Sequence, residues 1–483
     1  MKKKMMVMKT MVLIVMLMMV ALAGMGADSA PVQFIFGDSL SDVGNNNYLT
    51  KGIARAALPW YGIDIGMGLP NGRFTNGRTI ADIIDKLNFI FVTPTPQPVW
   101  RRWPEKGALF WGLISKVNLK VLYIILAGDY MGYPRPIAFM DQSLDVDAIL
   151  KNGVNYASGG GGILNDTGQL FVQRFCFYKQ IDLFQGTQKL VKEKIGSEAA
   201  DKFFKEASYV VALGSNDYIN NFLLPVYPDA WAYSSTGFTN LLISTLKDQL
   251  TLLHKLGARK LIFFGLGPMG CIPLERVMNT NYTCQDSVNK LAMSFNDNTK
   301  QLMQDLSAQL PNATFQFGDA YNEFADLIAN PLKHGRFLPN YCLIDSLFPE
   351  PQKLIRNFSC VLTGFSNADS PCCRLGRIRP SLTCTPASSL CKERSKYVFW
   401  DEYHPTEAAN QVIANAIIKK LSFRPLNAPP SAAAAPSNNT ASSPATTSVA
   451  PAGAPSSPTA LSPASSTTTV PFIATPPAPT PSS

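Results

Sequence analysis

Two short blocks near opposite ends of the chain carry the residue types that nucleophilic catalysis needs. An apolar run over residues 32–36 leads into Gly-Asp-Ser-Leu, which places Ser39 just after it, and Asp401 precedes His404 by three residues. A serine hydroxyl attacks a carbonyl at neutral pH only when a base takes its proton, and an imidazole base works best when a carboxylate orients it. Together, Ser39, His404 and Asp401 predict the chemistry of a serine hydrolase.

The scarcity of histidine narrows the choice of base, because the chain contains only 3 histidines. His254 falls among leucines at helical spacing, which predicts a packed or surface residue. His334 falls in a predicted loop with no carboxylate close in sequence. At His404, the spacing of three from Asp401 puts both side chains on one side of a turn. The alternative for this pair is a solvated position on the surface.

Two further blocks contain groups that could stabilise an oxyanion. Four glycines at 159–162 follow an apolar strand pattern and permit close approach of the backbone to a ligand. A phosphate-binding loop is disfavoured there, since no Lys-Ser or Lys-Thr follows. Asn216 follows the apolar run 209–213, and its amide could donate to an oxyanion, although an Asx turn is the simpler alternative. Gly37 allows a tight turn before Ser39, and a helix beginning there would direct N–H groups at the same oxyanion.

These residues must be positioned by elements that alternate along the chain. Strands are predicted at 32–36, 154–156, 209–213, 261–264, 314–317 and 397–400. Helices are predicted at 80–87, 238–256, 287–310 and 406–421. The alternation predicts an α/β fold with a mostly parallel sheet and helices on both faces. Active sites of such folds lie at the carboxyl ends of strands, and Ser39, Asn216 and Asp401 each follow a predicted strand.

The two ends of the chain differ in composition from its middle. Residues 1–27 begin with lysines, continue with an apolar run and end in small residues, which predicts a secretory signal peptide cleaved between Ala23 and Ala27. An uncleaved anchor is the alternative. Residues 425–483 are rich in Pro, Ala, Ser and Thr, which predicts a disordered tail. This tail is either a passive end or an O-glycosylated stalk associated with the cell wall. The catalytic domain is expected between these ends, at 28–424.

The distribution of charge bears on the choice of partner. The formal net charge is +9, and the predicted signal peptide contributes four of these charges through Lys2, Lys3, Lys4 and Lys9. The mature chain would carry no strong basic field, so nucleic acid is not an expected partner. Stable membrane insertion is not expected once the signal peptide is removed.

Nine cysteines in a secreted chain predict disulfides. Cys271 and Cys284 bracket a short loop, and a cluster of four begins with the adjacent pair Cys372 and Cys373. Two or three bridges are expected, with Cys176 unpaired. A zinc site is the alternative for the cluster, but adjacent cysteines are poorly spaced as ligands. Sequons for N-glycosylation occur at Asn165, Asn281, Asn312, Asn357 and Asn438.

The Gly-Asp-Ser-Leu, glycine-rich, Gly-Ser-Asn-Asp and Asp-x-x-His blocks, in this order, resemble the plant GDSL esterase/lipase family of SGNH hydrolases. The resemblance extends over about residues 32–421, and the stretches 71–78 and 265–271 are also similar to that family. It implies a three-layer α/β/α, flavodoxin-like fold with a central, mostly parallel sheet.

The same resemblance implies roles for individual residues. Ser39 would be the nucleophile, His404 the base and Asp401 the group that orients it. An oxyanion hole would be formed by the Ser39 N–H, the Gly160 N–H and the Asn216 side chain. No metal and no organic cofactor are implied.

Two segments depart from the pattern of that family. Residues 88–131 and 336–363 stand where sequences of the family run on almost directly, and neither segment has a sustained amphipathic period. We hypothesise that both are translated retained introns in the gene model. The alternative is that they are genuine loops forming a lid or a substrate surface, since long surface insertions cost little entropy.

The expected function is that of a secreted, extracellular or cell-wall serine esterase or lipase. It would hydrolyse a small-molecule, lipid or glycan ester through an acyl-serine intermediate. One alternative is an acyltransferase, similar to cutin synthases, in which an acceptor alcohol outcompetes water. Another is a non-catalytic wall glycoprotein whose site the two inserted segments disable. The oligomeric state does not follow from the sequence.

Overall fold

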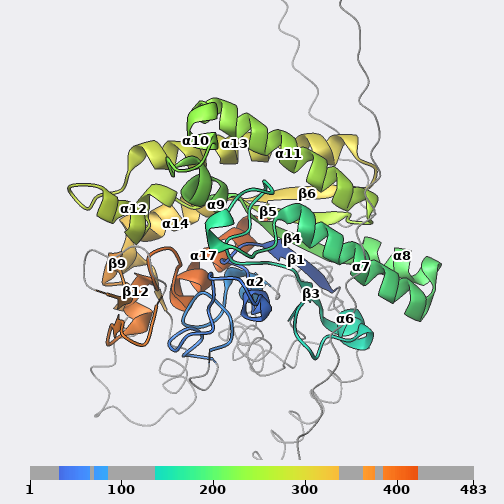
Figure 1. Ribbon diagram of the computed structural model, residues 1–483, viewed down its shortest axis with the longest axis horizontal. Coiled ribbons are helices and arrows are strands. Elements are labelled where there is room, and N and C mark those ends of the chain that lie inside the picture. The colour runs from blue at the N-terminus through green and yellow to red at the C-terminus, as the bar shows by residue number, and fades with distance from the viewer. Residues whose placement is uncertain (1–31, 66–69, 85–135, 337–362, 376–383, 422–483) are drawn as a thin grey trace, which may run out of the picture. The chain divides into compact units, whose positions relative to one another are not determined.

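The computed structural model describes residues 32–65, 70–84, 136–336, 363–375 and 384–421 (Figure 1). All of them belong to one compact unit, Met1–Asn427. The predicted signal peptide, the tail at 425–483, and the two atypical segments except for their outermost residues Arg336 and Thr363 lie outside the described residues. In the described part of the chain, no helix is long and apolar enough to cross a membrane.

A six-stranded sheet forms the centre of this unit, with the strand order β2-β3-β1-β4-β5-β6 and parallel pairing throughout. Its strands are β1 (Gln33–Gly37), β2 (Ile137–Ala138), β3 (Gly153–Asn155), β4 (Ser208–Ala212), β5 (Lys260–Phe264) and β6 (Thr314–Gly318). All five residues of β1 are buried, because both faces of a parallel sheet are covered and neither faces water.

Helices cover both faces of the sheet (Figure 1). The helices α7 (Phe177–Ile195), α11 (Ser235–Lys255) and α13 (Asp286–Gln309) lie on one face, and α2 (Ile80–Ile84) and α17 (Glu407–Lys420) lie on the other. Further described α-helices are α6 (Val146–Asn152), α8 (Ser197–Glu206), α9 (Ser215–Asp217), α10 (Asp229–Ala232), α12 (Pro273–Met278) and α14 (Ala320–Ala329). The predicted three-layer α/β/α fold is confirmed.

Aromatic packing fixes the central strand. Phe34 and Phe36 project from the same face of β1, since alternate residues of a strand share a face. The ring of Phe34 lies 5.1 Å from that of Phe184 on α7, and the ring of Phe36 lies 5.9 Å from that of Phe177. The two contacts seat β1 against α7 and so position the turn that follows β1.

Short strands outside the central sheet are β7 (Gly335–Arg336), β8 (Thr363–Gly364), β9 (Asn367–Pro371), β10 (Cys373–Arg374), β11 (Ser389–Leu390) and β12 (Tyr397–Phe399). The strand predicted at 397–400 is therefore present as β12, but it pairs with β9 and is not part of the central sheet. Local hydrogen bonds explain this pairing. The N–H groups of Cys372 and Cys373 donate to the carbonyls of Phe399 and Trp400 at 3.0 and 2.8 Å.

Candidate active site

Ser39 lies in the turn that follows β1, at the carboxyl end of the central sheet. The N–H groups of Ser41 and Asp42 both donate to the Asp38 carbonyl, at 3.1 and 2.9 Å. The expectation of a helix beginning at Ser39 is wrong, because this single turn leads only into a short 3₁₀ segment, Asn45–Tyr48. The N–H groups near Ser39 are thus presented by a turn and not by a helix N-terminus.

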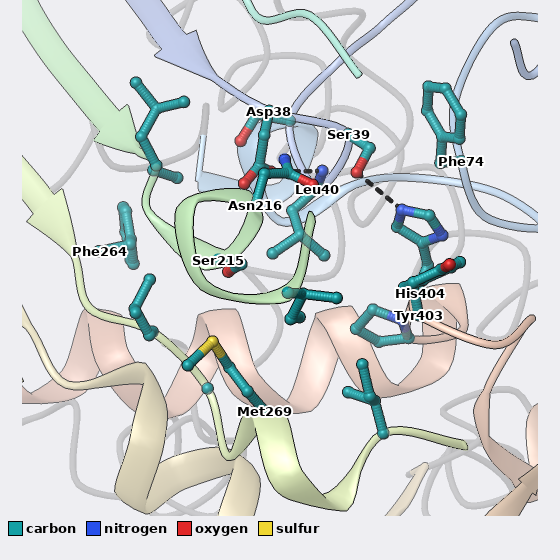
Figure 2. A pocket seen from close by; sticks show the side chains of 18 of the residues that line it. Asp38, Ser39, Leu40, Phe74, Ser215, Asn216, Phe264, Met269, Tyr403 and His404 are labelled. Atoms are coloured by element: carbon teal, nitrogen blue, oxygen red, sulfur yellow. Dashed lines mark hydrogen bonds between the residues drawn. The ribbon is translucent and has the colours of Figure 1, made fainter. Parts of the chain in front are cut away.

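Ser39, His404 and Asp401 are joined by hydrogen bonds (Figure 2). Ser39 Oγ lies 2.8 Å from His404 Nε2, and His404 Nδ1 lies 2.8 and 2.9 Å from the two carboxylate oxygens of Asp401. Asp401 and His404 come from the segment between β12 and α17. A proton on Nδ1 that is donated to Asp401 leaves Nε2 able to accept the proton of Ser39.

The carboxylate of Asp401 is fully buried. It accepts hydrogen bonds from the backbone N–H groups of Tyr403 and His404, at 2.9 and 2.8 Å, and from the Tyr61 hydroxyl at 2.8 Å. Burial alone would raise the pKa of Asp401, but the neighbouring His404 and the hydrogen bonds outweigh it, so that its pKa lies below the ordinary value of 3.8. Asp401 is therefore held as an anion beside the imidazole.

The Asn216 side chain is fixed through both of its polar atoms. Its Oδ1 accepts from Asn220 Nδ2 at 2.6 Å, and its Nδ2 donates to the Gly161 carbonyl at 2.9 Å. The amide nitrogen has two hydrogens, so one is left for a ligand. Asn216 lines the same cavity as Ser39, and it is carried by the short helix α9 directly after β4.

The glycine-rich run contributes one residue, Gly160, to the lining of the same cavity. The Gly159 N–H donates to Asp42 Oδ2 at 3.1 Å, and the Gly161 N–H donates to the Ser158 carbonyl at 2.9 Å. Among the hydrogen bonds of the described residues, the Gly160 N–H has no acceptor, and the same is true of the Ser39 N–H. Gly160 has a φ of 82°, which favours glycine, and it lines the cavity.

Two buried carboxylates fasten the loops around the site. Asp42 accepts from the Gly44 and Gly159 N–H groups, at 2.8 and 3.1 Å. Asp217 accepts from the Ile163 N–H at 2.9 Å. Asp42 therefore ties the glycine-rich run to the segment after β1, and Asp217 ties the residue that follows this run to the segment after β4. Burial raises the pKa of each carboxyl group from 3.8 to about 6.

The cavity beside Ser39 has a volume of about 300 Å³. Its polar wall includes Asp38, whose carboxylate accepts the Leu40 N–H at 2.9 Å. Asp38 is 2% exposed, and burial raises its pKa from 3.8 to about 7. The cavity is therefore lined by a serine, an imidazole, three residues that each carry an N–H group without an acceptor, and a carboxyl group whose pKa burial raises to about 7.

Sequence reasoning did not single out two side chains that support His404 and Asp401. Tyr61, fully buried, donates to Asp401, and the Phe74 ring lies 5.3 Å from the His404 ring and 5.9 Å from the Tyr61 ring. Phe74 falls in the stretch 71–78 that is similar to the family, and this similarity was the only indication in the sequence that Phe74 has a role at the site. Nothing in the sequence indicates that Tyr61 contacts Asp401.

The other two histidines lie elsewhere. His254 is buried on α11, and its Nε2 lies 3.0 Å from the Pro311 carbonyl. The prediction that His334 has no carboxylate close in sequence needs correction. Asp326 lies eight residues earlier, and its Oδ2 is 2.8 Å from His334 Nε2. The intervening residues are helical or turn and bring the two together.

Among the residues that the structure describes, three disulfides join Cys271 to Cys284, Cys372 to Cys391 and Cys373 to Cys384. Cys176 is the one free cysteine among the described residues. In the described ranges, no group of three or more His, Cys, Asp or Glu side chains could hold a metal ion. The sequon residues Asn165, Asn281 and Asn312 are exposed, whereas Asn357 and Asn438 lie outside the described residues.

Comparison with known proteins gives consistent matches. The family model described as GDSL-like Lipase/Acylhydrolase matches residues 132–417. The chain is 50% identical to GDSL esterase/lipase At1g74460 of Arabidopsis thaliana over 404 residues, which cover 84% of this chain and 91% of that protein. It is 40% identical to GDSL esterase/lipase At5g37690 of the same plant, and the match covers 83% of this chain and 92% of that protein. Asn216, Asp401 and His404 lie within the matched family segment, which begins just after the first atypical segment ends.

Proposed function

The chain belongs to the GDSL-like lipase/acylhydrolase family and is a carboxylic ester hydrolase, and we propose that it cleaves esters through an acyl-serine intermediate on Ser39. The observation that carries this proposal is the continuous line of hydrogen bonds from Ser39 through His404 to Asp401. Its geometry meets the requirement that the nucleophile lie within hydrogen-bond reach of a base that a third group orients.

In the proposed reaction, His404 Nε2 takes the Ser39 proton while Ser39 Oγ bonds to the ester carbonyl carbon. The Asp401 anion stabilises the imidazolium that forms. Collapse of the tetrahedral intermediate breaks the bond to the leaving oxygen, which takes the proton from His404 and departs as an alcohol. Water then attacks the acyl-serine with the same base, which releases the carboxylic acid and restores the Ser39 hydroxyl.

We propose that the Ser39 N–H, the Gly160 N–H and Asn216 Nδ2 stabilise the oxyanion of both tetrahedral intermediates. Support comes from the three residues lining one cavity and from the N–H hydrogen that each has to spare. Donors held in place before the reaction cost no reorganisation when the negative charge develops.

Secretion and the class of ester are also proposals. Secretion is supported by the signal-like residues 1–27 and by three disulfides, which form in oxidising compartments. Exposed sequons at Asn165, Asn281 and Asn312 fit N-glycosylation on that route. Similarity to proteins named GDSL esterase/lipase supports a lipid ester as substrate, and an ester of an acylated glycan is the alternative.

Hydrolysis of p-nitrophenyl acetate by the full secreted chain tests the proposed function. Ser39→Ala should lower kcat/KM by at least about a thousandfold, because removal of the nucleophile leaves only the contribution of the oxyanion donors and binding. The matched variant Ser294→Ala, on the exposed surface of α13, should behave like the wild type. Turnover by Ser39→Ala at the wild-type rate would refute the assignment.

A further inference from the structure

The cavity beside Ser39 is strongly asymmetric in polarity. Its polar side chains come mainly from the turn after β1 and from the segment after β4, where Asp38, Ser41, Ser215 and Asn216 line it. Apart from these residues and Ser39, Asn220, Tyr403 and His404, the lining side chains are apolar. We call one apolar part the β5 arm and define it by the side chains of Val210, Phe264, Met269, Ala320, Phe324 and Ile413. Each of the six is at most 9% exposed.

The direction of the β5 arm follows from the strand order. Gly37 of β1 pairs with Ala212 of β4, and Val211 pairs with Phe263 of β5, so Phe264, the last residue of β5, lies two strands away from the turn that carries Ser39. Two strand spacings amount to roughly 10 Å. In Figure 2, Phe264 and Met269 lie on one side of the Ser39–His404 pair and Phe74 lies on the other.

The far end of the β5 arm is closed by helices. Ala320 is the first residue of α14, and Ile413, 1% exposed, comes from α17. Phe324 is held in place by the ring of Phe399, at a centroid distance of 5.5 Å. The opposite part of the cavity is open, because Ile53 and Leu170, which also line it, are 64% and 37% exposed.

The reaction chemistry distinguishes these two parts. The alcohol must leave the site and be replaced by water before the acyl-serine can be hydrolysed, whereas the acyl group stays bonded to Ser39 until the end. An open part fits the leaving alcohol, and a closed apolar part fits a hydrocarbon chain that gains free energy from burial.

We propose that the β5 arm binds the acyl chain of the substrate and selects esters of medium-length fatty acids. This inference rests on the proposed function. Two strand spacings, roughly 10 Å, match the length of an extended octanoyl chain and are shorter than a palmitoyl chain. Each buried methylene should raise kcat/KM by up to about fourfold until the arm is filled.

The test compares p-nitrophenyl acetate, butyrate, octanoate and palmitate, each below its aggregation concentration. The wild type should prefer octanoate. Ala320→Leu fills the arm and should lower the ratio of kcat/KM for octanoate to that for acetate at least about tenfold. Met269→Ala enlarges the arm and should raise the ratio for palmitate to that for octanoate. Loss of stability alone lowers the rates for all four esters by the same factor and cannot change either ratio.

The control Ala329→Leu makes the same change at an exposed position of α14 and should leave the chain-length profile unaltered. Hydrolysis of acetate with a flat profile, or a profile that neither arm variant changes, would overturn this inference and leave the proposed function standing. Absence of hydrolysis of all four esters by the wild type would contradict the proposed function, and with it the inference.

Discussion

The Tyr61 hydroxyl joins the carboxylate of Asp401 to a disulfide. It donates to Asp401 Oδ2 at 2.8 Å and accepts the Cys384 N–H at 3.1 Å. Cys384 is bonded to Cys373, whose N–H donates to the Trp400 carbonyl at 2.8 Å. The cysteine-rich segment thus holds both the backbone before Asp401 and, through Tyr61, its side chain.

We expect Tyr61→Phe to lower kcat/KM by about tenfold to a hundredfold, because a buried hydrogen bond to a charged group contributes about 1.5–3 kcal/mol. The pH profile of kcat/KM should also shift, since Asp401 loses a donor that stabilises its anion. Both quantities are measured with p-nitrophenyl butyrate.

The control is Tyr209→Phe, which removes another buried hydroxyl, one that donates to the Phe204 carbonyl at 2.8 Å. It should lower stability with little effect on the pH profile. An unchanged pH profile for Tyr61→Phe would show that Tyr61 has no influence on Asp401.

The sequence predicts the central sheet well because its strands are short apolar runs followed by polar or glycine-rich turns. Ser39 and Asn216 could be expected to converge, since β1 and β4 are parallel neighbours and each residue follows its strand. The same reasoning fails for Asp401, which follows β12 outside the central sheet. Its position depends on backbone hydrogen bonds to the disulfide-bonded segment.

Other features lie beyond sequence reasoning. Tyr61 and Asp401 are 340 residues apart, and no local pattern indicates such a contact. The prediction also omits α7, where the buried residues Phe177, Ile181, Phe184 and Val191 keep helical spacing but stand among many polar residues. The short edge strand β2, Ile137–Ala138, is too brief for its alternation to be recognised.

Replacement of Gly160 tests the backbone donor. A Cβ atom at this position would collide with the ring of Phe171, and the φ of 82° disfavours other residues. Gly160→Ala should therefore displace the N–H and lower kcat by about a hundredfold, the typical cost of losing one oxyanion donor.

Gly186→Ala is the matched control, since a Cβ there meets nothing within 4 Å. It lies in α7 and should raise stability by about 0.5–1 kcal/mol without changing kcat. Wild-type kcat in Gly160→Ala would contradict the proposed role of this N–H.

Asp38 should make stability depend on pH. Its pKa is raised by burial to about 7 from an ordinary value of 3.8, so between these values the folded protein binds more protons than the unfolded chain. Stability then falls as pH rises through this window. Asp38→Asn does not lose stability in this way. The free energy of unfolding of the variant minus that of the wild type should therefore increase by up to about 4 kcal/mol from pH 4 to pH 8.

Urea unfolding at both pH values measures this difference. The control Asp297→Asn, on the exposed surface of α13, should differ from the wild type by the same amount at both pH values. A relative stability of Asp38→Asn that is equal at pH 4 and pH 8 would rule out the proposed titration.

The second atypical segment should be dispensable. Arg336 and Thr363 are paired across the antiparallel strands β7 and β8, so the chain returns to within about 5 Å of where it leaves. Replacement of residues 337–362 by Asn-Gly can close a two-residue hairpin. We expect a Tm within a few degrees of the wild type, as differential scanning calorimetry would measure, and unchanged kcat/KM for p-nitrophenyl acetate. A variant that does not fold would show that these residues are integral to the domain.

Covalent labelling of the nucleophile tests the central claim most directly. The full chain is treated with a fluorophosphonate, which phosphonylates an activated serine, and the modified peptide is identified by mass spectrometry. We predict one adduct, on Ser39, that forms as activity disappears and that His404→Ala slows by orders of magnitude. Complete inactivation with the adduct on another serine, or undiminished labelling in His404→Ala, would contradict the assignment of Ser39 and His404 as nucleophile and base.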